Sequence, residues 1–175
     1  NDHRAVATDS SLAIHLGQCL SRGERMDYAV QKATELGMAQ MTPLISERCE
    51  VRLKADRLTK RRQHWQQIAI SASEQSQRCS VPAVAPAQEL SQWITTVPAD
   101  LKLVLDPRAA QPLSSFQAPS SVALLIGPEG GLSEAEVSHA EVAGFLPIAL
   151  GPRVLRTETA PVAALSLLQY LWGDL

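Results

Sequence analysis

Apolar and polar residues follow two different periods along this chain, and the periods predict alternating strands and helices. Short apolar runs predict strands over residues 11–20, 41–45, 101–105, 122–126 and 147–150. Apolar residues three and four positions apart predict helices over residues 24–36, 55–78, 87–97, 134–144 and 159–172. This order favours an α/β fold, with a mostly parallel sheet that carries helices on both faces.

Single residues mark the ends and the inner faces of several predicted helices. Gly37 is placed to end the helix over residues 24–36, because glycine readily adopts the left-handed conformation of a helix C-terminus. Ser133 and Glu136 stand at the spacing of a capping box at the start of a helix. The inner stripe of the helix over residues 55–78 is expected to contain Leu58, Trp65, Ile68, Ala69 and Ala72.

Bulk composition is that of a single globular domain. The 175 residues are 45% hydrophobic and 19% charged, and no apolar run has the length of about 20 residues that a membrane helix requires. Cys19, Cys49 and Cys79 are widely spaced, and no histidine stands near them at ligand spacing. We therefore expect reduced cysteines, no metal site, no membrane association and a cytoplasmic location.

Charge is unevenly distributed along the chain. Residues 1–80 carry 12 Lys and Arg against 9 Asp and Glu, whereas the remainder is acidic and the whole chain has a net charge of −2. A basic cluster can neutralise phosphates and favours a polyanionic partner, although a solvated helix face is an equal alternative on composition alone. The candidate RNA-binding residues of this cluster are Arg48, Arg52, Lys54, Arg57, Lys60, Arg61 and Arg62.

Two polar loops follow predicted buried strands in the C-terminal half. Residues 127–131 read GPEGG directly after one strand, and residues 150–161 read LGPRVLRTETAP directly before the last helix. Glycine lets a ligand approach the backbone closely, and α/β proteins usually bind their ligands in loops at the ends of buried strands. We therefore expect a ligand site formed by these two loops.

The charge of the GPEGG loop and the lack of two known motifs limit the kinds of ligand that this loop can bind. A phosphate-binding P-loop requires a lysine after its glycines, and a dinucleotide loop requires GxGxxG; neither is present. Glu129 disfavours a pyrophosphate and tolerates a cationic ligand such as S-adenosylmethionine. A plain tight turn is an equal alternative for GPEGG by itself, but the second loop adds Arg153, Arg156 and Glu158, which a turn does not require.

Together the two loops closely resemble the ribosomal RNA small subunit methyltransferase E family of the SPOUT superclass. Three upstream segments are similar to the same family, namely residues 22–37 (RGERMDYAVQKATELG), 43–51 (PLISERCEV) and 73–78 (SEQSQR). The resemblance implies S-adenosylmethionine-dependent methylation of N3 of a uridine in small-subunit (16S-type) ribosomal RNA. It also implies a homodimer and a SPOUT-type deep trefoil knot at the C-terminal end, a feature that is otherwise almost absent from proteins.

The resemblance also implies a domain division. Members of this family usually begin with a small RNA-binding barrel of PUA type, which has no counterpart here. Residues 1–11 are therefore expected to be a linker or remnant from a missing barrel, and residues 12–175 the SPOUT methyltransferase domain.

By the same resemblance, three knot loops hold the cofactor largely through backbone groups. They correspond to residues 105–107, 126–131 and 150–160. The expected cofactor-binding residues are Leu105, Asp106, Ile126, Gly127, Pro128, Glu129, Gly130, Gly131, Leu150, Gly151, Leu155, Arg156, Thr157 and Ala160.

The expected catalytic residues lie in the same loops. Arg156 is the first candidate to contact the uracil carbonyls, since arginine presents a planar fork of donors, and Arg153 could do the same work. Glu129 and Glu158 are unranked candidates to accept the N3 proton or to fix an arginine. Arg78, in the last upstream segment, completes the expected RNA-binding set.

Two alternative functions remain open from sequence. One is a SPOUT methyltransferase that acts on transfer RNA, and the other is a non-catalytic RNA-binding or assembly module with the same fold. The residues at 156 and 158 are those expected of an active enzyme and argue against the second alternative.

Overall fold

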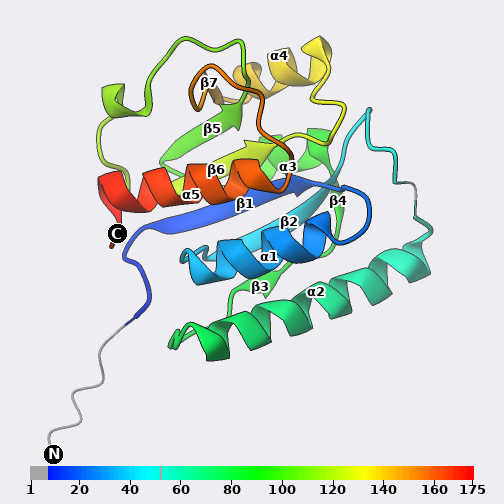
Figure 1. Cartoon of the computed structure of the whole chain (residues 1–175). Coiled ribbons are helices and arrows are strands. Elements are labelled where there is room, and N and C mark those ends of the chain that lie inside the picture. Colours follow the sequence, from blue (N-terminus) through cyan, green and yellow to red (C-terminus); the bar gives the residue numbers. More distant parts are fainter. Residues whose placement is uncertain (1–7, 52) are drawn as a thin grey trace, which may run out of the picture.

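One seven-stranded sheet, in which every strand pair is parallel, organises the chain (Figure 1). The structure, a computed structural model, describes residues 8–51 and 53–175, so predictions for residues 1–7 and Arg52 lie outside it. The strand order is β3-β2-β1-β6-β5-β7, with β4 also paired to β2. The strands are β1 (Ala13–Cys19), β2 (Gln40–Ile45), β3 (Ala83–Val84), β4 (Gln88–Glu89), β5 (Leu101–Leu105), β6 (Ser121–Ile126) and β7 (Leu146–Ile148).

Helices cover both faces of the sheet, as predicted (Figure 1). On one face α1 contacts both α2 and α5, and on the other face α3 contacts α4. Parallel strands require such crossover helices, because each strand must return to the same end of the sheet. The helices are α1 (Arg25–Glu35), α2 (Ala55–Gln75), α3 (Leu90–Thr96), the 3-10 turn η1 (Leu113–Ser115), α4 (Glu134–Val142) and α5 (Thr159–Trp172).

The core is centred on β1 and β6, which pair along six positions with Leu16 opposite Leu124. Gly17 is required there for packing: a Cβ atom at this position would lie only 2.5 Å from the ring of Trp93. The absence of that Cβ lets α3 place Trp93 directly on the sheet, where its ring also packs 5.8 Å from that of Phe145. A substitution at Gly17 would push α3 off this face.

Local sequence signals are confirmed at two helix ends. The Ser133 hydroxyl accepts a hydrogen bond from the Glu136 amide at 3.2 Å, and the Glu136 carboxylate accepts one from the Ser133 amide at 2.9 Å. Gly37 has φ of +80° directly after α1. Both features satisfy backbone groups that have no partner within the helix itself.

The predicted boundaries differ from the structure in four places. The predicted helix over residues 87–97 begins only at Leu90, because residues 88–89 pair with β2 as β4. Helix α2 ends at Gln75, since Gln77 has φ of +59° and turns the chain away. Strand β3 lies in a stretch for which no strand was predicted, and β7 covers Leu146–Ile148 instead of residues 147–150. These short strands depend on pairing partners that no local pattern reveals.

Parallel strands place their carboxyl ends at one edge of the sheet. Strands β6, β5 and β7 are neighbours in the sheet, so the segments that follow them meet at that edge. These segments contain the three loops predicted to hold the cofactor. The parallel sheet and its two helical layers are thus as predicted, while the trefoil knot stays a prediction.

Residues 8–11, expected to be part of a linker, pack against the domain. The Thr8 hydroxyl donates to the Gln77 carbonyl at 2.6 Å, and the Ser10 hydroxyl donates to the Gln169 side chain at 2.7 Å. The predicted domain boundary at residue 12 stays a prediction.

Candidate functional site

A cavity of about 360 Å³ opens at the edge where β5, β6 and β7 end, a volume within the range of small-molecule sites. Its wall combines apolar side chains, glycines and a few charged groups from all three predicted loops. The lining residues are Arg48, Leu105, Asp106, Pro107, Arg108, Ile126, Gly127, Pro128, Glu129, Gly130, Gly131, Leu132, Val137, Ala149, Leu150, Gly151, Arg153, Val154, Leu155, Thr157 and Ala160.

The structure brings together every residue of the predicted cofactor set except Arg156. Of the predicted catalytic residues, Glu129 and Arg153 line the cavity, whereas Arg156 and Glu158 do not. Arg156 is exposed to solvent beside the cavity loop. Sequence reasoning missed five wall residues. Arg108, Leu132 and Ala149 adjoin the predicted loops, Val154 lies within the third loop, and Val137 belongs to α4.

Backbone conformation shapes the cavity at two glycines. Gly131 has φ of +70° and Gly151 has φ of +77°, a region that other residues rarely adopt. Substituting either would strain its loop, although a Cβ at either position has open space around it. The two predicted glycine-bearing loops therefore owe their shape to glycine conformation at these points.

A buried chain of hydrogen bonds joins two of the cavity loops to the centre of the sheet. The Thr157 hydroxyl donates to the Gly127 carbonyl at 3.1 Å and accepts a hydrogen bond from Nε2 of Gln18 at 3.1 Å. Gln18 lies near the end of β1 and is only 1% exposed. Because both loop positions line the cavity, Gln18 and Thr157 fix the separation of its two walls.

An acidic residue on the β5 loop is held ionised. Asp106 is buried and accepts hydrogen bonds at 3.1 Å from Nε and Nη2 of Arg108. The bonds from Arg108 lower the pKa of Asp106, against a smaller opposing effect of burial. The cavity wall therefore carries a fixed negative charge, paired with an exposed arginine.

Arg25, at the start of α1, is a charged residue of the site that sequence reasoning missed. Its Nη1 lies 2.8 Å from Oε1 of Glu129, and its Nε lies 3.9 Å from Oε2 of Glu158. The predicted catalytic carboxylates therefore meet at one guanidinium. The sequence did contain a sign of this role, because Arg25 belongs to the segment over residues 22–37 that resembles the family.

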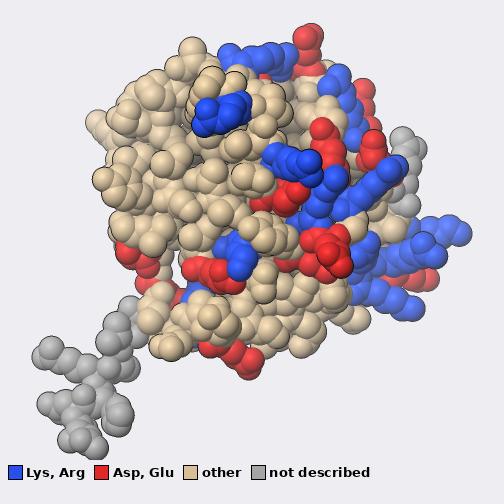
Figure 2. All heavy atoms as spheres, in the orientation of Figure 1, with Lys and Arg blue, Asp and Glu red and all other residues tan. Residues whose placement is uncertain are grey.

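The candidate RNA-binding residues are mostly on one side of the molecule. Figure 2 shows Lys and Arg side chains gathered at the side where α2 begins. Lys54, Arg57 and Lys60 are exposed there, and Arg61 is half-buried. Nε of Arg62 donates to the Val84 carbonyl at 2.8 Å, which ties part of this side chain to β3.

Arg48 connects this basic side to the cavity. It is exposed, lines the cavity and donates from Nη1 to the Gly130 carbonyl at 3.2 Å. The exposed basic residues and the cavity wall are therefore joined through the loop that follows β2.

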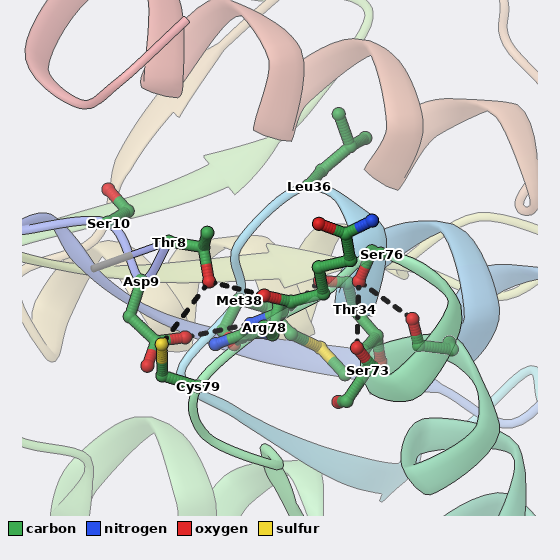
Figure 3. A network of polar contacts seen from close by, with 12 residues as sticks. Thr8, Asp9, Ser10, Thr34, Leu36, Met38, Ser73, Ser76, Arg78 and Cys79 are labelled. Atoms are coloured by element: carbon green, nitrogen blue, oxygen red, sulfur yellow. Dashed lines mark hydrogen bonds and ion pairs between the residues drawn. The ribbon is translucent and has the colours of Figure 1, made fainter. Parts of the chain in front are cut away.

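The structure gives Arg78 a different role from the predicted RNA contact. Its side chain is 6% exposed, and its Nε pairs with Asp9 at 3.1 Å. Its Nη1 donates to the carbonyls of Thr34 and Met38 at 3.0 and 2.9 Å (Figure 3). Nε and Nη1 of Arg78 thus join the end of α2 to Asp9 and to the turn before β2. The predicted contact of Arg78 with RNA stays a prediction.

Among residues 8–51 and 53–175, none of the helices combines the length and the apolar character that a membrane-spanning helix needs. The same residues contain no group of three or more His, Cys, Asp and Glu side chains that could hold a metal ion.

Sequence comparison relates the chain to RNA-modifying enzymes. Residues 8–169 match the RNA methyltransferase domain family. The ribosomal RNA small subunit methyltransferase E of Buchnera aphidicola subsp. Schizaphis graminum is 41% identical over 169 residues, which cover 95% of this chain and 69% of that protein. The Bacillus subtilis protein of the same name is 34% identical over 169 residues, with 91% and 66% covered. The chain thus spans about two thirds of these relatives.

Solved structures agree with the sequence relatives. The Legionella pneumophila protein Lpg2936, solved with bound SAM, has a TM-score of 0.95 and 45% identity, covering 97% of this chain and 71% of that one. The ribosomal RNA small subunit methyltransferase E of Neisseria gonorrhoeae, solved with S-adenosyl methionine, has a TM-score of 0.90 and 44% identity, covering 95% and 69%. The predicted family is confirmed: this chain belongs to the ribosomal RNA small subunit methyltransferase E family of RNA methyltransferases.

Proposed function

We propose that this chain carries the S-adenosylmethionine-dependent activity that methylates N3 of a uridine in small-subunit ribosomal RNA. The observation that carries the proposal is the meeting of all three predicted loops in one cavity. It is supported by the family match and by relatives of 44% and 45% identity that bind S-adenosylmethionine in their own structures. The cytoplasmic location expected from sequence belongs to the same proposal.

The cavity wall suits S-adenosylmethionine in shape and in charge. Leu105, Ile126 and Leu155 supply apolar surface for an adenine ring, and the glycine-bearing loops expose backbone groups to its polar edges. Glu129 and the ionised Asp106 offset the positive charges of the ligand. When bound, S-adenosylmethionine would supply an activated methyl group on a sulfonium.

The remaining work of catalysis belongs to the chain itself. Uridine N3 is a poor nucleophile until it loses its proton, so the base must be oriented and its N3 proton must have an acceptor. Orientation of two reactants can supply about 7–11 kcal/mol of the barrier. Arg153 lines the cavity and is the arginine best placed to contact a uracil carbonyl, while exposed Arg156 is better placed for a neighbouring phosphate.

RNA approaches the cavity along the basic side in this proposal. Lys54, Arg57, Lys60 and Arg61 at the start of α2 neutralise phosphates, and Arg48 extends the positive charge to the cavity wall. Arg62 contributes through the part of its guanidinium that is not bonded to Val84. Arg52 was predicted for the same surface and lies outside the described residues.

A homodimer is part of the proposal. The outer side of α5 exposes Leu167, Tyr170 and Leu171 at 42%, 73% and 38%, and Figure 2 shows a broad surface without charge where α5 lies. Val154 of the cavity loop is 82% exposed. Large exposed apolar residues that gather on one side are typical of an interface, and a second copy of this chain is the expected occupant.

A two-step experiment tests the function. Calorimetry with S-adenosylmethionine should detect binding, and ligand at 100 times its dissociation constant should stabilise the fold by about 2.7 kcal/mol. Radiolabelled methyl transfer should then be measured with unmethylated small subunits and, in parallel, with transfer RNA. Label at N3 of a uridine in the small-subunit RNA is the expected result. Label found only in transfer RNA would contradict the proposed substrate. Binding of S-adenosylmethionine without methyl transfer would contradict the proposed activity.

A further inference from the structure

Two carboxylates from different loops meet one arginine beside the cavity. Glu129 follows β6, Glu158 precedes α5, and Arg25 begins α1. Arg25 Nη1 lies 2.8 Å from Glu129 Oε1, and its Nε lies 3.9 Å from Glu158 Oε2. The side chains of Arg25, Glu129 and Glu158 are 40%, 22% and 20% exposed, so all three are partly shielded from water.

Glu129 is fully engaged by this arrangement. Its Oε1 accepts hydrogen bonds from Nη1 of Arg25 at 2.8 Å and from the backbone amide of Arg22 at 3.0 Å. Burial raises the pKa of Glu129, but these two bonds and one from its own amide outweigh that effect and lower it. Glu129 is therefore an ionised anchor and a poor acceptor for a substrate proton.

Glu158 is not engaged in the same way. Its Oε2 is inaccessible to water and has no hydrogen-bond partner among the described residues. The 3.9 Å to Arg25 Nε is an ion-pair distance and too long for a hydrogen bond. A shielded carboxylate oxygen without a donor is energetically costly, so Glu158 has unused capacity to accept a hydrogen bond or a proton.

Glu158 lies one contact away from the cavity wall. Its neighbours Thr157 and Ala160 line the cavity, and Arg25 connects it to Glu129, which also lines the cavity. Among the described residues, Arg25 is the only cation within 4 Å of Glu158. The same guanidinium also forms an ion pair with Glu129. Arg25 therefore holds Glu158 beside Glu129.

We propose that Arg25 is a positioning residue that binds Glu129 as a fixed anchor and presents Glu158 as the acceptor of the uridine N3 proton. This inference rests on the proposed function. The N3–H bond breaks and its proton passes to Glu158. The N3 electron pair forms the bond to the methyl carbon, and the electron pair of the broken carbon–sulfur bond stays with sulfur, which becomes a neutral thioether. The proton then leaves Glu158 for solvent.

The test is methyl transfer to small subunits, with kcat and KM measured separately. Glu158→Gln should lower kcat by about a hundredfold or more, the usual contribution of a positioned base, with unchanged affinity for S-adenosylmethionine. Arg25→Gln should lower kcat with little change in KM, because Glu158 is then no longer held beside Glu129. Arg25→Lys should restore much of kcat, because it keeps the charge.

Lys32→Gln is the matched control. It removes a positive charge from the same helix, but Lys32 pairs at 3.0 Å with Glu35 of α1 and with neither of the two carboxylates beside the cavity. It should retain the wild-type kcat. Circular dichroism and calorimetry with S-adenosylmethionine on every variant separate a loss of fold from a loss of chemistry, and Arg25→Lys keeps the test valid if Arg25→Gln does not fold.

Each outcome decides one part of the inference. Wild-type kcat in Glu158→Gln would overturn the proton acceptor. Wild-type kcat in folded Arg25→Gln would overturn the positioning role, even if Glu158→Gln were inactive. Absence of transfer by the wild-type chain would instead overturn the proposed function, which is a distinguishable result.

Discussion

Thr157 shows how one hydroxyl can act on the whole cavity. It bonds the Gly127 carbonyl and the Gln18 amide, both parts of the junction between two cavity loops. Thr157→Val should leave the buried Gln18 amide and the carbonyl without that partner, which costs about 1–3 kcal/mol of folding free energy. Denaturant unfolding would measure this loss. Exposed Thr159→Val is the control, and equal stability of the two variants would contradict the role given to Thr157.

Also at the residue scale, Asp106 is expected to make the stability of the fold depend on pH. Arg108 lowers the pKa of this carboxyl below its ordinary value of 3.8, so the folded state favours the ionised form. The stabilisation is therefore present above pH 3.8 and is lost as the pH falls through the lowered pKa. Melting temperatures of wild type and Arg108→Gln should differ at pH 6 and converge as the pH falls well below 3.8. A difference that persists in acid would contradict the assignment.

At the scale of elements, Arg78 joins the end of α2 to the turn between α1 and β2. Arg78→Met should destabilise the fold by about 1–3 kcal/mol, because the buried carbonyls of Thr34 and Met38 lose the donor that they have in the wild type. Urea unfolding measures the change. RNA affinity per folded molecule should be unchanged, because the side chain is 6% exposed. Loss of RNA affinity with wild-type stability would restore the original RNA-binding prediction.

The first turns of α2 carry exposed basic residues, Arg57 and Lys60. Reversing Arg57 and Lys60 to Glu should weaken RNA binding and reduce its salt dependence, because fewer counterions are released from phosphate. Filter binding at several salt concentrations measures both effects. Affinity for S-adenosylmethionine should not change, and unchanged RNA affinity would leave these residues as a solvated helix face.

At the scale of the whole molecule, the exposed side of α5 predicts the oligomeric state. Leu167→Asp combined with Tyr170→Asp should convert a dimer to a monomer, since both side chains are exposed on this helix and a charge there opposes burial. Light scattering after size-exclusion chromatography gives the mass. Val142→Asp, on exposed Val142 of α4, is the control and should remain dimeric. A monomeric wild type would remove the dimer from the proposal.

How much of the structure can be predicted from the sequence also depends on scale. The capping box at Ser133 and the turn at Gly37 were predicted because their partners lie within a few residues. The α3 boundary was missed because residues 88–89 are held by β2, more than 40 positions earlier, and pairing overrides local helical preference. Nearly all predicted cofactor positions reached the cavity wall, since consecutive loop residues at strand ends stay together.

By itself, the sequence determined the alternating strands and helices, the parallel sheet and the loops that carry the cavity, because periodicity, capping and glycine act over short stretches of chain. Only the tertiary structure decided that Arg25 meets Glu129, 104 positions away, and that Arg78 lies inside the fold between Asp9 and two carbonyls. Those contacts depend on strand order and helix packing, which bring together side chains whose separation along the chain carries no local signal.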